Sequence, residues 1–132
     1  MKPLLIDHIG IIVKNIELSL LFYQGILGLP LTGIEKNSEH NITIAFLSCG
    51  ETLVELIQPT GDGAFKQFIE TRGEGLHHLA VRVENIEESI DSLRCNSVPL
   101  LDLHPKSGSG ASKIAFLDAC AANNVSIELI ER

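Results

Sequence analysis

The sequence contains the same short unit twice, at an offset of 70 residues. The stretch Ile44–Leu47 reads Ile-Ala-Phe-Leu, and so does Ile114–Leu117. The pattern Val-x-Asn-Ile-Glu-x-Ser begins at Val13 and again at Val83. In a chain of 132 residues, which fits one domain, this repeat predicts two half-domains rather than two independent folds.

The repeat also pairs four potential metal ligands. His8 falls on His78 at the offset of 70, and Glu55 falls on Glu128 when three extra residues are allowed late in the second copy. Each Glu lies in an apolar run typical of a strand covered on both faces, where a lone carboxylate needs a cation, a metal or a proton. A lone histidine in a strand is more often structural than a ligand, but the recurrence of His and Glu at equivalent positions favours a single site. Two imidazoles and two carboxylates suit a borderline divalent ion, such as Ni²⁺, Co²⁺, Zn²⁺, Mn²⁺ or Fe²⁺.

Four other polar residues are excluded from this ligand set. Asp7 and His77 each precede a proposed histidine ligand, and the alternation of side chains along a strand turns them to the opposite face. His40 and His104 fall in expected loops, so we expect them at the surface.

The three cysteines form no Cys-x-x-Cys pair, which argues against a thiolate zinc site.

Composition excludes several classes of protein. A net charge of −7 without a basic stripe argues against a nucleic-acid binder. No apolar run approaches the roughly 18–20 residues of a membrane span, and charge interrupts the N-terminus too early for a signal peptide. We therefore expect a cytoplasmic protein with reduced cysteines that acts on a small molecule.

The expected class is α+β, with the order strand–helix–three strands in each copy. The first module (about 4–59) is predicted to contain a strand at 4–13, a helix at 16–27 capped by Asn15, and strands at 30–36, 41–48 and 52–59. A connector at 60–75 includes a short helix near 64–71. The second module (about 76–132) is predicted to contain a strand at 76–83, a helix at 86–96, and strands at 98–103, 112–117 and 125–131. Residues 106–112 read as a flexible loop, either a substrate-contacting lid or an ordinary hairpin loop.

These patterns resemble the vicinal oxygen chelate superfamily, which includes glyoxalase, bleomycin resistance proteins and dioxygenases. Segments Ile6–Ile11, Val54–Leu56 and Gly73–Ala80 carry the resemblance, and the last is most similar to methylmalonyl-CoA epimerases. The resemblance covers nearly all of residues 1–132. It implies a single domain of two tandem βαβββ modules that form a curved mixed sheet around a metal site, often within a homodimer.

The resemblance also implies a site and a reaction. His8, Glu55, His78 and Glu128 would bind one divalent ion, and a substrate with two vicinal oxygens would chelate it. Glu128 would remove a proton next to the carbonyl of an acyl-CoA or similar thioester, and Glu55 would act from the opposite face. The sequence departs from epimerases at Thr43, near which some of them carry a second catalytic carboxylate, and at 118–125, which differ from the usual final hairpin.

Other activities of the superfamily remain open at this stage. A glyoxalase I-type lyase, acting on the hemithioacetal of a 2-oxoaldehyde and glutathione, would use the same ligands, and only Gly73–Ala80 favours the epimerase. A non-catalytic ligand-binding protein is a third class, but such members commonly lack the full ligand set. A ring-cleaving dioxygenase typically has two His and one Glu, so Glu55 would occupy a position needed for oxygen.

Overall fold

The computed structural model describes residues 1–132, which divide into two compact units. The N-terminal unit comprises Ile9–His77, and the C-terminal unit comprises Met1–His8 together with His78–Arg132. Strand β1 (Pro3–Ile12) is divided between them. The division therefore differs from the boundary between the two repeats, and it places His8 in the same unit as His78 and Glu128.

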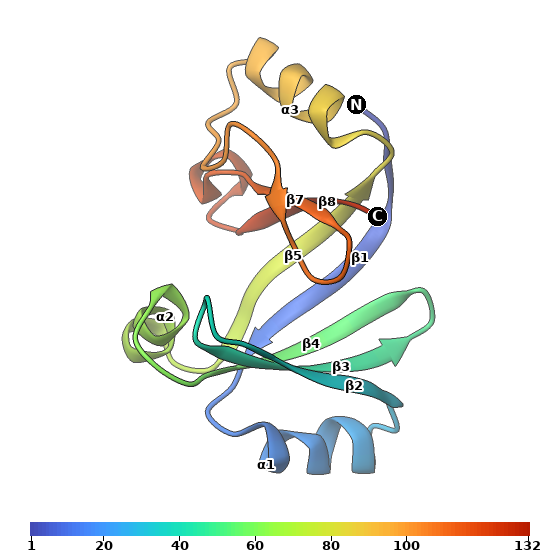
Figure 1. Ribbon diagram of the computed structural model, residues 1–132, viewed down its shortest axis with the longest axis vertical. Coiled ribbons are helices and arrows are strands. Elements are labelled where there is room, and N and C mark those ends of the chain that lie inside the picture. Colours follow the sequence, from blue (N-terminus) through green and yellow to red (C-terminus); the bar gives the residue numbers. More distant parts are fainter. The chain divides into compact units, whose positions relative to one another are not determined.

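The N-terminal unit contains a sheet with the strand order β2-β3-β4-β1. Neighbouring strands β2, β3 and β4 are antiparallel. Figure 1 shows α1 against these strands. The elements after β1 are α1 (Ile16–Leu20), the π-helix η1 (Leu21–Ile26), β2 (Leu31–Asn37), β3 (Ile42–Cys49), β4 (Thr52–Pro59) and α2 (Ala64–Arg72).

The register of β3 and β4 separates the two faces of this sheet. Ala45 lies opposite Leu56, and both side chains are fully buried in an apolar cluster with Ile16 of α1. The next pair along the strands is Phe46 and Glu55, which alternation turns to the other face. Glu55 therefore lies on the face that α1 does not cover.

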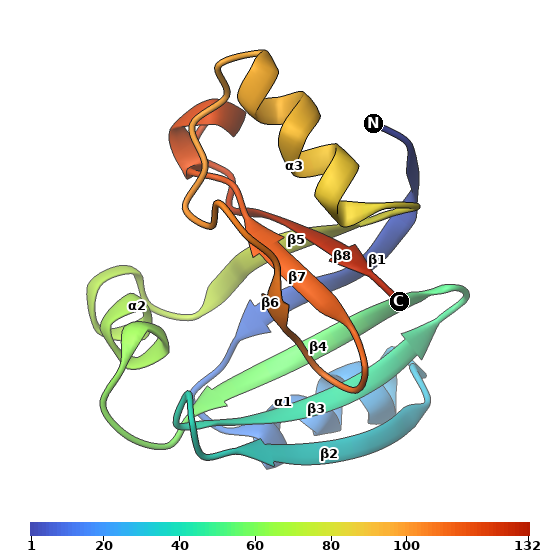
Figure 2. The ribbon, with the colours of Figure 1, turned by 45° about the horizontal axis from the view of Figure 1, so that its top comes forward.

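The C-terminal unit contains the strand order β1-β5-β8-β7-β6. Strands β5 and β8 are parallel, whereas β8, β7 and β6 are successively antiparallel. Helix α3 packs on β7 and β8, as Figure 2 shows, and an apolar core fills that contact. The elements are β5 (Gly75–Val83), α3 (Ile86–Cys95), β6 (Lys106–Ser107), β7 (Lys113–Phe116), the 3-10 helix η2 (Ala119–Ala122) and β8 (Ile127–Glu131).

Both repeats begin their first helix with the same hydrogen bonds. The side chain of Asn15 accepts from the backbone N–H of Leu18, and the side chain of Asn85 accepts from that of Glu88. These are N-caps, which satisfy donors that the first turn of a helix leaves free. The predicted cap at Asn15 is thus confirmed.

A second bond ties each helix start to a strand. The backbone N–H of Ile16 donates to the side chain of Gln58, and that of Ile86 donates to the side chain of Glu131. Gln58 and Glu131 each lie three residues after the repeated Glu, so the duplication extends to the contacts that orient the helix on its sheet.

The predicted strand at 98–103 is wrong. Only a single bridge, between Leu100 and Leu117, is present there. The backbone N–H of Phe116 donates to the side chain of Asp102, at 2.8 Å, instead of to a backbone carbonyl of a neighbouring strand. The segment also contains Pro99 and is followed by Pro105, and neither proline can donate a hydrogen bond to a sheet.

The third strand of the second module is instead the short β6, within the segment expected to be a flexible loop. Its turn is tight, since a Cβ at Gly108 would lie 2.6 Å from side-chain atoms of both Ile114 and Ser112. Residues 106–112 therefore form a closely packed hairpin.

The predicted fold class and the order of the elements are confirmed. The chain has the α+β class and the order strand–helix–three strands in both modules. The short helix in the connector is α2. Gly28, just after the first helix, has the left-handed φ of 82° that glycine accommodates at a helix end. All three cysteines are free and exposed, and none of the helices combines the length and apolarity that crossing a membrane requires.

Candidate metal centre

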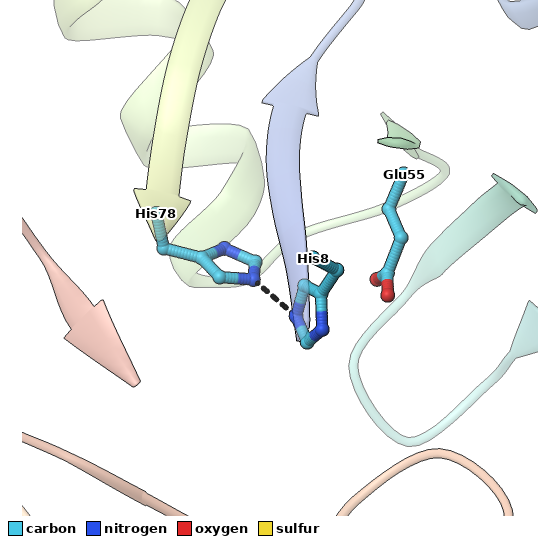
Figure 3. A group of neighbouring side chains, drawn as sticks. All are labelled: His8, Glu55 and His78. Atoms are coloured by element: carbon cyan, nitrogen blue, oxygen red, sulfur yellow. Dashed lines mark hydrogen bonds between the residues drawn. The ribbon is translucent and has the colours of Figure 1, made fainter. Parts of the chain in front are cut away.

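Three of the four predicted ligands meet in the C-terminal unit. His8 of β1 and His78 of β5 point their rings at one another, with 3.0 Å between the two Nε2 atoms (Figure 3). Glu128 of β8 lies beside them because β8 pairs with β5, where Ala80 is its partner. Its carboxylate oxygens lie 3.4 Å from Nε2 of His78 and 3.7 Å from Nε2 of His8. All three residues are 4–5% exposed.

Asp7 holds the far side of the His8 ring. Its carboxylate, 1% exposed, accepts from Nδ1 of His8 at 2.8 Å and also from the guanidinium groups of Arg82 and Arg132. Burial by itself raises the pKa of Asp7, but the hydrogen bonds from His8, Arg132 and Arg82 outweigh it and hold the pKa far below its usual range. Asp7 is therefore ionised and can only accept, so Nδ1 of His8 is the donor.

This arrangement fits a metal ion. With the proton on Nδ1, neutral His8 presents the lone pair of Nε2 to the cluster. Two nitrogen ligands at right angles, each about 2.1 Å from one ion, lie about 3.0 Å apart, which is the separation observed between His8 and His78. A carboxylate hydrogen-bonded to the outer nitrogen of a histidine is the usual support for a histidine that binds a metal. The cluster thus brings two imidazole nitrogens and a carboxylate together, with separations of 3.0–3.7 Å between the nitrogen and oxygen atoms concerned.

Glu55 belongs to the N-terminal unit. It is buried on β4. Its cross-strand partner is Phe46, just as Phe116 is the partner of Glu128. Each repeat therefore places a buried Glu beside a Phe on the same face of its sheet.

The sequence predictions omitted the residues that support the cluster. Asp7, which strand alternation excluded from the ligand set, accepts a hydrogen bond from Nδ1 of His8, and this bond was not anticipated. The adjacent position of Asp7 is a weak local signal for that bond. No sequence pattern predicted the bonds of Asp7 to Arg82 and Arg132, because these residues lie 75 and 125 positions from Asp7 in the sequence. His40 and His104 are exposed, as predicted.

His77 has a different role from His78. Its ring stacks on Phe65, with centroids 4.8 Å apart, and meets Phe68 edge-on at 4.7 Å. Both phenylalanines belong to α2, so His77 fixes that helix to the start of β5. Burial of the imidazole, assisted by the positive charge of Arg72, lowers the pKa of His77 to about 4.

This pKa predicts an acid-sensitive contact. In the unfolded chain His77 has the ordinary pKa of about 6.5, whereas in the folded chain its pKa is about 4. As the pH falls from about 6.5 towards 4, the unfolded chain therefore binds a proton that the folded chain does not bind. Stability from neutral His77 is thus present above pH 6.5 and lost below it. We expect His77→Phe to match the wild type at pH 7 and to become the more stable protein at pH 4.5, in urea unfolding of the metal-free chains. A constant difference between the two proteins across this range would contradict the assignment.

An open pocket of about 610 Å³ lies elsewhere in the N-terminal unit, and its lining includes Lys14, Gln58, Lys66 and Glu70. The ammonium of Lys66 lies 3.1 Å from Asp62 and 3.8 Å from Glu70. Its positive charge is thereby largely balanced. None of the four predicted ligands lines this pocket.

Comparison with known proteins identifies several relatives. Residues 7–116 match the model of the Glyoxalase/Bleomycin resistance protein/Dioxygenase superfamily. An uncharacterized protein of Bacillus subtilis, YqjC, is 37% identical over 96% of this chain and 91% of its own length. The crystal structure of the hypothetical protein BH1468 from Bacillus halodurans has a TM-score of 0.94 and 39% identity, covering 97% of this chain and 94% of that one.

An epimerase is also among the structural relatives. A variant of Streptomyces coelicolor methylmalonyl-CoA epimerase, in complex with 2-nitronate-propionyl-CoA, has a TM-score of 0.89 and 27% identity, covering 98% of this chain and 95% of that one. The similarities to these whole proteins cover 96–98% of this chain and therefore extend over both repeats.

Proposed function

Because the chain belongs to the Glyoxalase/Bleomycin resistance protein/Dioxygenase superfamily, we propose that it is a metal-dependent epimerase acting on an acyl-CoA or similar thioester. The observation that carries the proposal is the buried cluster of His8, His78 and Glu128, with Nε2 of His8 kept available by Asp7. The likeness to an epimerase that binds an acyl-CoA ligand supports the substrate class. The reaction would move the proton next to the thioester carbonyl.

In this proposal His8, His78 and Glu128 hold one divalent ion, and Glu55 of the N-terminal unit is the fourth ligand. The burial of Glu55 supports this, because a buried carboxylate must be compensated by a cation, a hydrogen bond or a proton. The role of Glu55 as a ligand is also supported by its equivalence to Glu128 in the repeat, because each Glu has a Phe as its cross-strand partner. Co²⁺, Ni²⁺, Zn²⁺ and Mn²⁺ all suit two imidazoles and two carboxylates.

The residues would divide the chemistry between two faces of the substrate. A bound divalent ion supplies Lewis-acid polarisation of the carbonyl oxygen, which makes the neighbouring carbon acidic. Glu128 would remove the proton on one side as general base, and Glu55, carrying a proton on one carboxyl oxygen, would return it on the other side and leave as the carboxylate. Inversion at that carbon requires both carboxylates. Some epimerases carry a second catalytic carboxylate near the position of Thr43, which has none. We therefore assign the proton transfer on the second face to Glu55.

The direct test is exchange of the proton next to the carbonyl in D₂O. Purified, metal-reconstituted protein would be incubated with a panel of acyl-CoAs, including methylmalonyl-CoA, and deuterium incorporation followed by mass spectrometry. A parallel assay would use methylglyoxal with glutathione. The proposal expects enzyme-dependent exchange in at least one acyl-CoA and none of the lyase activity. Lyase activity without exchange would reassign the chain to the glyoxalase I class, and neither activity would favour a ligand-binding protein.

Asp7 provides a prediction about metal affinity. Asp7→Asn removes the charge that keeps the proton of His8 on Nδ1, and we expect the affinity for Zn²⁺ or Co²⁺ to fall by about 10–100-fold, as is typical when a supporting group is lost. Isothermal titration calorimetry measures this without any assay of activity. Asp118→Asn is the matched control, because the Asp118 carboxylate caps η2 by accepting from the backbone N–H of Cys120 and supports no histidine. Equal affinities of wild type and Asp7→Asn would refute the positioning role.

A further inference from the structure

The carboxylate of Asp7 binds two arginines as well as His8. Its oxygen Oδ2 accepts from Nε of Arg82 at 2.9 Å and from Nε of Arg132 at 2.8 Å, and it lies 2.8 Å from Nη2 of Arg82. Oδ1 accepts from Nη2 of Arg132 at 2.9 Å and from Nδ1 of His8 at 2.8 Å. Both oxygens thus have donors for their lone pairs, so Asp7 cannot turn away from His8 without losing hydrogen bonds.

The group formed by Asp7, Arg82 and Arg132, here called the charge cluster, has a net charge of +1. Asp7 is ionised, and each guanidinium group carries one positive charge. The two arginine side chains are only 32% and 33% exposed, so water screens their charges only in part. An ionised carboxylate alone on the outer nitrogen of a histidine makes the other nitrogen a more basic ligand. The charge cluster instead places a net positive charge behind His8.

The repeat shows that the fold does not require these charges. The equivalent positions hold three uncharged residues: Ile12 for Arg82, Pro59 for Arg132 and, beside the other histidine ligand, His77 for Asp7. Ile12 is fully buried, so an apolar side chain satisfies that strand position. Ion pairs that are buried also give little net stability, since apolar residues of similar volume often replace them without loss. The charges beside His8 therefore need an explanation other than folding.

We propose that Arg82 and Arg132 are positioning residues that fix Asp7 on His8 and cancel its negative charge. His8 is then held with Nε2 towards His78 and Glu128, but it gains no extra negative charge from Asp7. A positive charge behind a ligand weakens the binding of a cation and strengthens the effect of a bound cation on a carbonyl. The arginines would thus raise the acidity of the substrate and lower the affinity for metal. This inference rests on the metal site of the proposed function.

The two arginines bind Asp7 differently. Arg132 bridges both oxygens with two nitrogens, a bidentate geometry that fixes the plane of the carboxylate. Arg82 contacts Oδ2 alone, so it mainly supplies charge. Without Arg82, Asp7 still has its bonds to Arg132 and His8. A change at Arg82 therefore removes the charge and leaves the orientation of Asp7 in place.

The test is the affinity of the whole chain for Co²⁺, measured by isothermal titration calorimetry at pH 8. Arg82→Gln should bind Co²⁺ at least about fivefold more tightly than the wild type, because a partly screened positive charge has been removed. Arg82→Lys retains the charge and should stay within about twofold of the wild type. The matched control is Arg94→Gln, which removes the same charge from an exposed position of α3 and should change nothing. Since Asp7→Asn should weaken binding, the two changes act in opposite directions, whereas a merely structural role of Arg82 would weaken binding in both.

Deuterium exchange at saturating Co²⁺ and substrate is the second measurement, and it should be at least about fivefold slower in Arg82→Gln only. Weaker or unchanged binding in folded Arg82→Gln would overturn the inference, as would equal tightening in Arg82→Lys or an unchanged exchange rate. If circular dichroism shows that Arg82→Gln is unfolded, Arg82→Met replaces it. A wild type that binds Co²⁺ but exchanges no acyl-CoA would end the proposed function, and the affinities alone would then decide the inference. A wild type that binds no Co²⁺ would overturn both.

Discussion

Glu128→Gln is expected to slow deuterium exchange next to the thioester carbonyl by at least about 10³-fold. The change keeps the size of the side chain and one oxygen that can face the cluster, but it removes the group able to accept a proton. Because Glu128 lies 3.4 Å from Nε2 of His78 in a buried site, no water-exposed carboxylate can replace it there. The exchange rate under saturating substrate, measured by mass spectrometry in D₂O, reports the loss.

Glu131→Gln is the matched control for this change. Glu131 lies on the same strand, three residues later, and accepts a hydrogen bond from the backbone N–H of Ile86. Its equivalent in the first repeat is Gln58, which makes the same bond, so Gln is compatible with that position. We expect Glu131→Gln to exchange at the wild-type rate. If Glu128→Gln also retains exchange within about tenfold of the wild type, a different residue is the base.

His78→Ala is expected to abolish both metal retention and exchange, whereas His77→Ala preserves them. His78 contributes Nε2 to the cluster, and the loss of a ligand should weaken metal binding by more than the 10–100-fold typical of a supporting residue. A bound ion stabilises the folded state in proportion to the logarithm of its concentration over Kd, so the thermal midpoint of wild type should rise when metal is added. We expect no such rise in His78→Ala.

The adjacent histidine makes this comparison specific. His77 precedes His78 on β5 but contacts Phe65 and Phe68 of α2, so His77→Ala should lower the thermal midpoint while leaving the metal-induced rise intact. The reverse pattern, with metal response lost in His77→Ala and kept in His78→Ala, would show that the ligand was assigned to the wrong strand face.

Sequence periodicity was enough to select the converging residues in the C-terminal unit. The offset of the repeat selected His8 and His78, and strand alternation separated them from Asp7 and His77. The two helices were predictable because each has an Asn cap and an inward apolar stripe. These features depend on local spacing, which a sequence records directly.

Features that depend on distant or competing contacts could not be predicted. The ion pairs of Asp7 involve Arg132, at the opposite end of the sequence, and no local pattern records such a contact. The expected strand at 98–103 failed because the side chain of Asp102 takes the hydrogen bond that a strand would make. Leu101 and Leu103 of this segment are exposed.

The most direct test of the central claim is the metal content of the purified chain after reconstitution, determined by inductively coupled plasma mass spectrometry. If His8, Glu55, His78 and Glu128 hold one ion, the wild type should contain about one divalent transition metal ion per chain. Under the same washing conditions, His78→Ala and Glu55→Gln should contain almost none. A wild type without bound metal would contradict the account, and a folded Glu55→Gln variant with full metal content would remove Glu55 from the ligand set.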